Sequence, residues 1–220
     1  MKDMLGPIIG ISGIFLILVV TEALWRTNVI KKPEYSRKII HILSGSFIAF
    51  WPFIMTFREI QLLSLLLLAV VSISKSLRFF MSIHGVGRQT LGEIFFPIGI
   101  LVAATFTESS WIYTAAILHL SLADGLAAAV GIRHNKHFGY KVIGQMKTVI
   151  GTAVFYVTSL LIVAAAMVLD PTSFGYNAPI ILLLLPLIVT LVENFAPYGT
   201  DNLFIPAFVV GVLETLKVVV

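Results

Sequence analysis

The chain has 220 residues, of which 58% are hydrophobic and only 12% are charged, and its formal net charge is +4. A soluble domain of ordinary composition carries about 25% charged residues, so this composition excludes that class and indicates an integral membrane protein. The sequence has no cysteine, which excludes disulfides, Cys-ligated zinc and thiol catalysis. No repeat, low-complexity tract or linker divides the chain, so we expect a single integral membrane domain over residues 1–220.

Apolar runs separated by short polar connections predict about eight transmembrane helices. Several runs are shorter than the ~20 residues that cross a bilayer core, and Pro52, Pro97, Pro186 and Pro206 lie inside them. Irregular backbone at membrane depth is tolerated where it lines a wet cavity. The predicted fold is therefore all-α, a polytopic helix bundle around a polar pocket. Its helices are expected at Leu5–Trp25, Ile39–Met55, Ile60–Ser74, Leu91–Phe106, Trp111–Ile132, Val149–Leu169, Ala178–Val192 and Leu203–Val220.

The distribution of Lys and Arg predicts the orientation. Twelve of the fifteen lie in the connections 26–38, 75–90 and 133–147, and only Lys2, Arg58 and Lys217 fall on the opposite side. The positive-inside rule places the first set in the cytoplasm. Both termini then lie on the outer side, in agreement with an even number of helices. The unusual polar clusters all fall on the cytoplasmic side.

The first cluster in chain order is Arg37, Lys38 and His41. His41 follows Arg37 by four residues and Lys38 by three, so the three side chains share a helix face. Basic residues at a membrane edge also fix topology and contact lipid headgroups, and a histidine inside an apolar run can serve packing through one hydrogen bond. Both interpretations stay open at this stage.

Glu93 and Asp124 are two carboxylates that lie inside apolar runs near the predicted cytoplasmic side. A charged side chain there costs ~2.5–3.5 kcal/mol on insertion scales, which makes each a functional candidate. For Asp124 the alternative is an ion pair with a loop lysine. The small residues that follow it, from Gly125 to Gly131, favour a close helix–helix seam, which would also leave room for a ligand.

Two further clusters lie at helix starts. Lys147, Thr148, Gly151 and Thr152 place a cation and hydroxyls at a helix N-terminus, which suits an anion, although Thr148 could simply cap the helix. Glu193 lies at one end of a short loop that ends in Asp201 and Asn202, which could form a turn and helix cap. No cation lies beside these acids in sequence, so we expect a divalent cation near them.

This inventory of carboxylates, Lys, Arg and Thr/Gly helix starts suits Mg²⁺-dependent chemistry on a nucleotide polyphosphate. The sequence contains no G-x-x-x-x-G-K-[ST], which excludes a P-loop.

The ordered set of motifs from about Ser36 to Pro206 resembles the polyprenol kinase group, which contains phytol kinases, dolichol kinases and CTP-dependent diacylglycerol kinases and is distantly similar to CDP-diacylglycerol synthase. The resemblance rests on Arg37-Lys38-x-x-His41, Gly92-Glu93, Asp124-Gly125-x-Ala127 with Gly131, Lys147-Thr148-x-x-Gly151-Thr152, and Asp201-Asn202 with Pro206.

The resemblance implies a membrane-embedded kinase that moves the γ-phosphoryl group of CTP to the hydroxyl of a prenol, polyprenol or diacylglycerol at the cytoplasmic face of a cell or ER-type membrane. It implies that Asp124 and Asp201 hold Mg²⁺ or orient the attacking hydroxyl, and that Asp124, Lys147, Glu93 and His41 have catalytic roles, with Glu93 as the general base or a further metal ligand. Glu193 is expected as another metal ligand because no cation lies beside it in sequence. Nucleotide binding would fall to Arg37, Lys38, Lys141, Lys147, Thr148, Gly151, Thr152 and Asn202. No nucleic-acid partner is expected, and the oligomeric state stays open.

Two other functions are compatible with the same residues. A cytidylyltransferase would attack the α-phosphate of CTP, and the early Arg37-Lys38-x-x-His41 favours the kinase by analogy. A small ion-coupled transporter would need acids near the middle of the membrane and repeat symmetry. The acids lie at one rim and no repeat is present.

Overall fold

The computed structural model describes residues 5–30, 33–77 and 91–217, without the side chains of 33–34, 76–77, 134–138, 172–173 and 176. The basic connection 75–90 therefore lies largely outside the described residues. The long helices are α1 (Leu5–Arg26), α2 (Pro33–Ala49), α3 (Phe57–Leu77), α5 (Gly92–Phe106), α6 (Ser110–Leu118), α7 (Asp124–Phe138), α8 (Val149–Leu169), α10 (Ala178–Phe195) and α11 (Asp201–Leu216). Short helical turns lie at Trp51–Phe53, Pro171–Phe174 and Gly175–Asn177.

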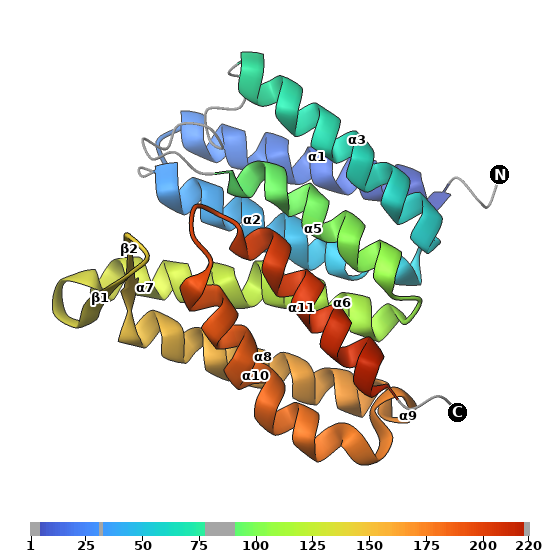
Figure 1. Ribbon diagram of the computed structural model, residues 1–220. Coiled ribbons are helices and arrows are strands. Elements are labelled where there is room, and N and C mark those ends of the chain that lie inside the picture. The colour runs from blue at the N-terminus through green and yellow to red at the C-terminus, as the bar shows by residue number, and fades with distance from the viewer. Residues whose placement is uncertain (1–4, 31–32, 78–90, 218–220) are drawn as a thin grey trace.

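The predicted all-α class is confirmed, and within the described residues each of the eight predicted segments overlaps a helix (Figure 1). Five helical stretches in the described residues are long and apolar enough to cross a membrane, at Leu5–Arg26, Phe57–Lys75, Ser110–Arg133, Val149–Leu169 and Ala178–Phe195. Helix α5 is apolar but shorter. The count of eight spans and the outer position of the termini stay predictions.

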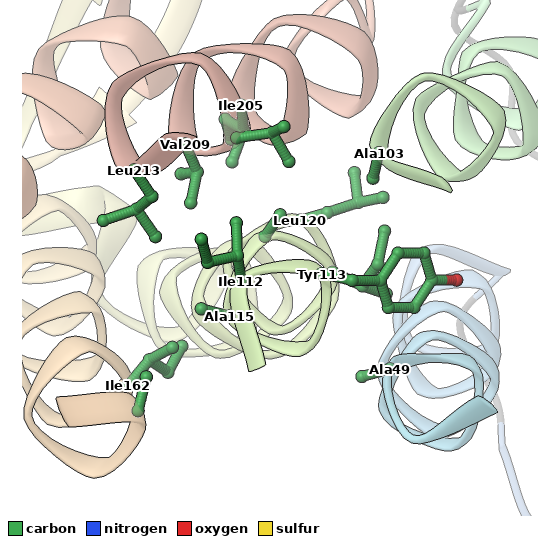
Figure 2. Close-up of a cluster of buried hydrophobic side chains, with 14 of the residues drawn as sticks. Ala49, Ala103, Ile112, Tyr113, Ala115, Leu120, Ile162, Ile205, Val209 and Leu213 are labelled. Carbon is green, nitrogen blue, oxygen red and sulfur yellow. The ribbon is translucent and has the colours of Figure 1, made fainter. Parts of the chain in front are cut away.

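The fifth predicted segment forms the centre of the bundle. Its helix runs through α6, a π-helical turn at His119–Ala123, and α7. Helix α6 is apolar on all sides, as a helix surrounded by other helices must be. Ile112 and Leu120 lie among side chains of α2, α5, α8 and α11, which include Ile162 and Val209 (Figure 2).

Residues 139–148, expected as a loop, form a small antiparallel ribbon in an otherwise helical chain. Strands β1 (Gly139–Val142) and β2 (Gln145–Thr148) pair with Tyr140 opposite Lys147. The two residues between them, Ile143 and Gly144, have φ of +45° and +77°. Two-residue hairpin turns favour positive φ because it matches the strand twist. The ribbon folds back over the polar end of the bundle (Figure 1).

Candidate active site

The π-helical turn sets the position of Asp124. The backbone N–H of Asp124 donates to the carbonyls of His119 and Ser121, and so bypasses Leu120, the i−4 carbonyl that a regular α-helix would use. The Leu120 carbonyl accepts a hydrogen bond instead from Nε2 of His41, at 2.8 Å. The turn therefore links α2 to the helix of Asp124 through one histidine.

Small residues allow this close contact between α2 and the central helix. A Cβ on Gly45 would collide with the side chain of Ser121, and one on Gly125 would collide with Ile42. The predicted seam of small residues after Asp124 is thus confirmed. Ala127, Ala128 and Gly131 of the same stretch also line the polar cavity described below, so close packing and open space occur side by side.

Asp124 is buried, at 5% exposure, and forms an ion pair with Lys38, whose Nζ lies 2.7 Å from Oδ2. Nε2 of His41 lies 3.4 Å from the same oxygen. The sequence alternative was an ion pair with a loop lysine, but the partner comes from α2, 86 residues earlier. The face shared by Lys38 and His41 was predicted correctly from their spacing.

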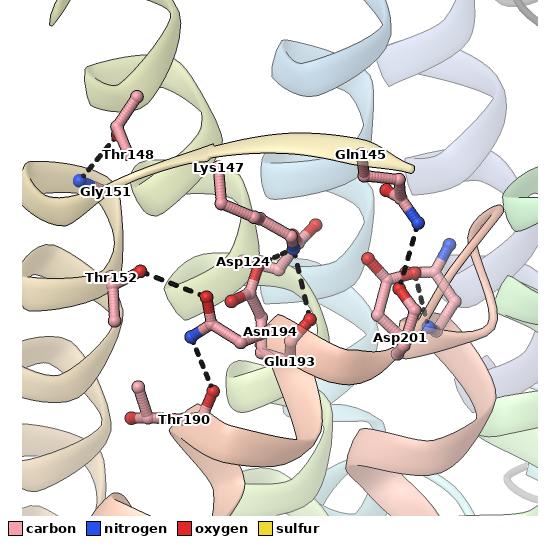
Figure 3. Close-up of polar contacts among 12 residues, drawn as sticks. Asp124, Gln145, Lys147, Thr148, Gly151, Thr152, Thr190, Glu193, Asn194 and Asp201 are labelled. Carbon is pink, nitrogen blue, oxygen red and sulfur yellow. Dashed lines mark hydrogen bonds and ion pairs between the residues drawn. The ribbon is translucent and has the colours of Figure 1, made fainter. Parts of the chain in front are cut away.

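A second ion pair joins the hairpin to α10. The ammonium of Lys147 contacts the Glu193 carboxylate and lies 3.1 Å from the Glu193 carbonyl oxygen. The expectation that Glu193 has no cation beside it is therefore wrong. Sequence distance hid the partner, since the hairpin brings Lys147 back over the end of α10 (Figure 3).

Thr148 caps α8, because its hydroxyl accepts the N–H of Gly151 at 3.0 Å. That N–H is consequently occupied in this structure. The next hydroxyl, on Thr152, contacts the Tyr140 hydroxyl and Oδ1 of Asn194. Tyr140 also donates to Asn194, so the hairpin, α8 and α10 are fastened together.

These side chains surround a polar cavity with two adjoining lobes. The first lobe, of about 140 Å³, is lined by the charged residues Lys38, Asp124, Lys147, Glu193 and Asp201 and by Thr148, Gly151 and Thr152. The second, of about 430 Å³, shares Lys38, Asp124 and Asp201 with the first and adds Arg37, His41 and Asn202. Figure 3 shows Asp124, Lys147 and Glu193 pointing toward one another.

The charges in this cavity influence one another strongly. Burial lowers the pKa of Lys147, but the carboxylates of Glu193, Asp124 and Asp201 together outweigh burial, so the pKa is raised. Burial and the nearby Asp124 carboxylate raise the pKa of Asp201. Asp201 accepts the backbone N–H of Asn202 and has no ion-pair partner among the described residues. Asp124 and Glu193 each have a lysine partner, so Asp201 is the carboxylate of the cavity that most lacks a counter-charge.

Three predicted site residues lie elsewhere or have additional contacts. Glu93 forms an ion pair with Lys75, at 2.6 Å, and lines neither lobe of the polar cavity. Lys141 is exposed and lies opposite Met146, on the other face of the ribbon from Lys147. Asn202 lines the second lobe and also donates to the Gly92 carbonyl at 2.7 Å.

The sequence reasoning missed three residues of this site. Gln145 and Met146 line both lobes, and Tyr140 anchors the hairpin through Asn194. The alternation of residues 140–142 and the glycine at 144 signal a hairpin. In a hairpin with its turn at residues 143–144, Tyr140 pairs with Lys147, so their side chains lie on the same face of the ribbon.

The carboxylates of the polar cavity bear on whether a metal ion could bind there. In the described part of the chain, no group of three or more His, Asp or Glu residues is arranged to hold a metal ion. Mg²⁺ needs fewer protein ligands, since it usually binds one or two carboxylates and completes its shell with phosphate oxygens and water. Asp201 and Asp124, which both line the two lobes, meet that smaller requirement.

The fold and the cavity define a helical membrane protein with a charged, partly buried cavity at the hairpin end of its bundle (Figure 1). Among curated proteins, the chain is 29% identical over 208 residues to a protein named phytol kinase from Synechocystis sp., a match that covers 90% of this chain and 86% of that protein. The similarity supports an assignment to the polyprenol and phytol kinase family. No protein-family model and no solved structure matches the chain.

Proposed function

We propose that this protein is a lipid-alcohol kinase. It transfers the γ-phosphoryl group of a nucleoside triphosphate, CTP by family resemblance, to the hydroxyl of a membrane alcohol at the cytoplasmic face. The observation that carries the proposal is the gathering of Lys38, Asp124, Lys147 and Asp201 from four elements around one cavity, in a chain similar to a phytol kinase.

Charge in the first lobe supports a metal–nucleotide ligand. Two lysines face three carboxylates there, so the lobe by itself repels a polyphosphate. A divalent cation removes that repulsion. Asp201 and Asp124 would hold Mg²⁺, which would neutralise charge on the transferring phosphate. Glu193 is a weaker candidate ligand, because Lys147 already neutralises it.

The protein's own residues position the reactants. Lys147 lies where it can reach a phosphate while Glu193 holds it, and Arg37 and Lys38 add positive charge from the second lobe. The hydroxyl oxygen bonds to the γ-phosphorus, the bond from that phosphorus to the β,γ-bridging oxygen breaks, the nucleoside diphosphate leaves, and the hydroxyl proton is released. Such transfer depends mainly on positioning and charge stabilisation.

The donor and the metal are tested together. Purified protein in detergent is incubated with geranylgeraniol, phytol or diacylglycerol and with CTP, ATP, GTP or UTP, each with Mg²⁺ or with EDTA. We expect a phosphorylated prenol with CTP that disappears in EDTA. An equal amount of product in EDTA would contradict the dependence on Mg²⁺. Product formed only from another nucleotide would contradict CTP as the phosphoryl donor. If no combination of alcohol and nucleotide gave a phosphorylated lipid, the result would contradict the kinase activity and favour a transporter.

A further inference from the structure

A second, apolar cavity of about 110 Å³ lies between α1, α2, α3 and α5. Most of its lining surface is apolar and comes from aliphatic and aromatic side chains such as Leu18, Leu67 and Phe96, while Glu93 of α5 also lines it. Val70, also in the wall, is 46% exposed on α3, so the cavity reaches the outer surface of the bundle. In a membrane protein that surface faces lipid.

The apolar cavity adjoins the polar one. Arg37, His41 and Asn202 line both the apolar cavity and the second polar lobe. A molecule seated in the apolar cavity therefore has its end at the same residues that border the proposed nucleotide site.

His41 lies at this junction with its orientation fixed. Nε2 faces two acceptors, the Leu120 carbonyl at 2.8 Å and the Asp124 carboxylate at 3.4 Å, so Nε2 carries a proton. In a neutral imidazole the other nitrogen, Nδ1, is then an acceptor. The ring also packs against Phe96 in the cavity wall, with centroids 5.0 Å apart.

One turn further along α2, Ser44 gives independent evidence for a polar ligand atom. Ser44 is 5% exposed and lines the apolar cavity. Its buried hydroxyl has no hydrogen-bond partner among the described residues. Buried hydroxyls are nearly always bonded, so an unsatisfied one in a cavity wall indicates a missing polar partner.

We propose that this cavity binds the acceptor, a single-chain isoprenoid alcohol, with its hydroxyl at the junction beside His41 Nδ1 and Ser44. The inference rests on the proposed kinase function. A dry cavity of about 150 Å³ holds a molecule the size of benzene, so this one accommodates roughly one five-carbon unit and the remaining chain continues into lipid. A diacylglycerol, with two chains beside its hydroxyl, fits it less well.

Photolabelling tests the site without any catalysis. A geranylgeraniol analogue with a diazirine near its hydroxyl end is irradiated with the purified protein in detergent, without nucleotide, and labelled peptides are mapped. We expect label on α1, α2, α3 or α5 at residues of the cavity wall, removed by excess geranylgeraniol. Label confined to other helices, or unaffected by competitor, would overturn the proposal.

Kinetics supply a matched pair of variants on α3. Leu67→Trp fills the cavity, whereas Leu66→Trp changes a neighbouring residue that is 50% exposed and absent from the wall. Filling the site of one isoprene unit should raise the KM for geranylgeraniol about tenfold and leave the KM for CTP unchanged in Leu67→Trp, with both constants unchanged in Leu66→Trp. Equal effects of the two variants would overturn the site.

The two proposals fail separately. If geranylgeraniol removes the label from the cavity but no phosphoryl transfer is detected, the alcohol site stands and the kinase function is rejected. Phosphoryl transfer with label elsewhere would retain the kinase and reject this site. If Leu67→Trp does not fold, the labelling of the unmodified protein decides alone.

Discussion

Nε2 of His41 lies 2.8 Å from the carbonyl oxygen of Leu120, inside the π-helical turn that immediately precedes Asp124. This hydrogen bond joins the helix that supplies Lys38 to the helix that supplies Asp124. It also leaves Nδ1 of His41 as the acceptor at the junction of the two cavities.

Replacing His41 by Ala should lower both stability and kcat. The Leu120 carbonyl loses its donor, which costs about 1–3 kcal/mol if the group stays buried, and a misplaced hydroxyl lowers kcat by roughly 100-fold. Thermal unfolding and alcohol-kinase assays measure the two effects.

His119→Ala is the matched control for His41→Ala. His119 is also buried and bonds the Ala115 carbonyl and Ser159, but it lines neither the polar nor the apolar cavity. We expect it to lower stability while the folded fraction keeps its kcat. An equal loss of kcat in both variants would refute a specific role for His41.

Asp124→Asn should abolish transfer and destabilise the protein. It leaves Lys38 buried without its partner, and breaking a buried ion pair costs about 3–5 kcal/mol. The double variant Asp124→Asn with Lys38→Met removes both charges, so we expect unfolding stability to recover while activity stays at least about 100-fold reduced. Recovery of activity with stability would show that the pair is structural only.

Lys147→Ala should raise the KM for CTP and lower kcat, since it removes one of the two lysines that line the first lobe. Lys141→Ala removes the same charge from the other face of the hairpin, where Lys141 lines no part of the polar cavity. We expect near-normal constants in that variant. A larger effect at Lys141 would mean that the nucleotide lies on the outer face of the ribbon.

The raised pKa of Lys147 predicts a pH profile. A raised folded pKa means that the ion pair stabilises fully below the unfolded lysine value of about 10.4 and loses its effect only as pH rises through the higher folded value. The KM for CTP should therefore stay flat from about pH 7 to about pH 9.

Glu193→Gln should change that profile. Burial lowers the pKa of Lys147, and without the Glu193 carboxylate only Asp124 and Asp201 oppose burial, so the pKa falls. The charge is then lost at lower pH, and the KM for CTP should rise within the same interval. If the KM for CTP depended on pH in the same way in the unmodified protein and in Glu193→Gln, Glu193 would not be what keeps Lys147 protonated.

Ile143→Asn should stabilise the hairpin. Ile143 has φ of +45°, a region that costs an ordinary L-residue about 1–2 kcal/mol and that Asn tolerates better. We expect a higher midpoint of thermal unfolding with unchanged KM for CTP. Met146→Asn, an exposed strand position in the same ribbon, serves as control and should give no such increase.

The helices could be predicted from the sequence because apolar runs report membrane and core burial directly. The order of segments and the distribution of basic residues predicted that five residues gather at one end of the bundle. The structure places all five, Lys38, Asp124, Lys147, Glu193 and Asp201, around one cavity. The partners within that cluster could not be predicted. Lys38 pairs with Asp124 across 86 residues and Lys147 reaches Glu193 across 46, and local spacing carries no information about such pairs.

Two other features depended on the three-dimensional structure. In the π-helical turn before Asp124, the hydrogen bond reaches the i−5 carbonyl in place of the i−4 carbonyl, a local change that apolar periodicity does not register. The apolar cavity arises from four helices whose lining residues are ordinary core side chains in sequence. The polar lining residues Ser44 and His41 are the reason that we propose an alcohol site there.

The central claim, γ-phosphoryl transfer to a lipid alcohol, is tested most directly with CTP labelled separately at its α- and γ-phosphates. Unmodified protein and the Asp124→Asn variant are each incubated with geranylgeraniol and Mg²⁺, and label in the extracted lipid is counted. We expect lipid label from γ-labelled CTP only, and none in the variant. Label from the α position would contradict the account and identify a cytidylyltransferase, and γ transfer undiminished in Asp124→Asn would show that the site lies elsewhere.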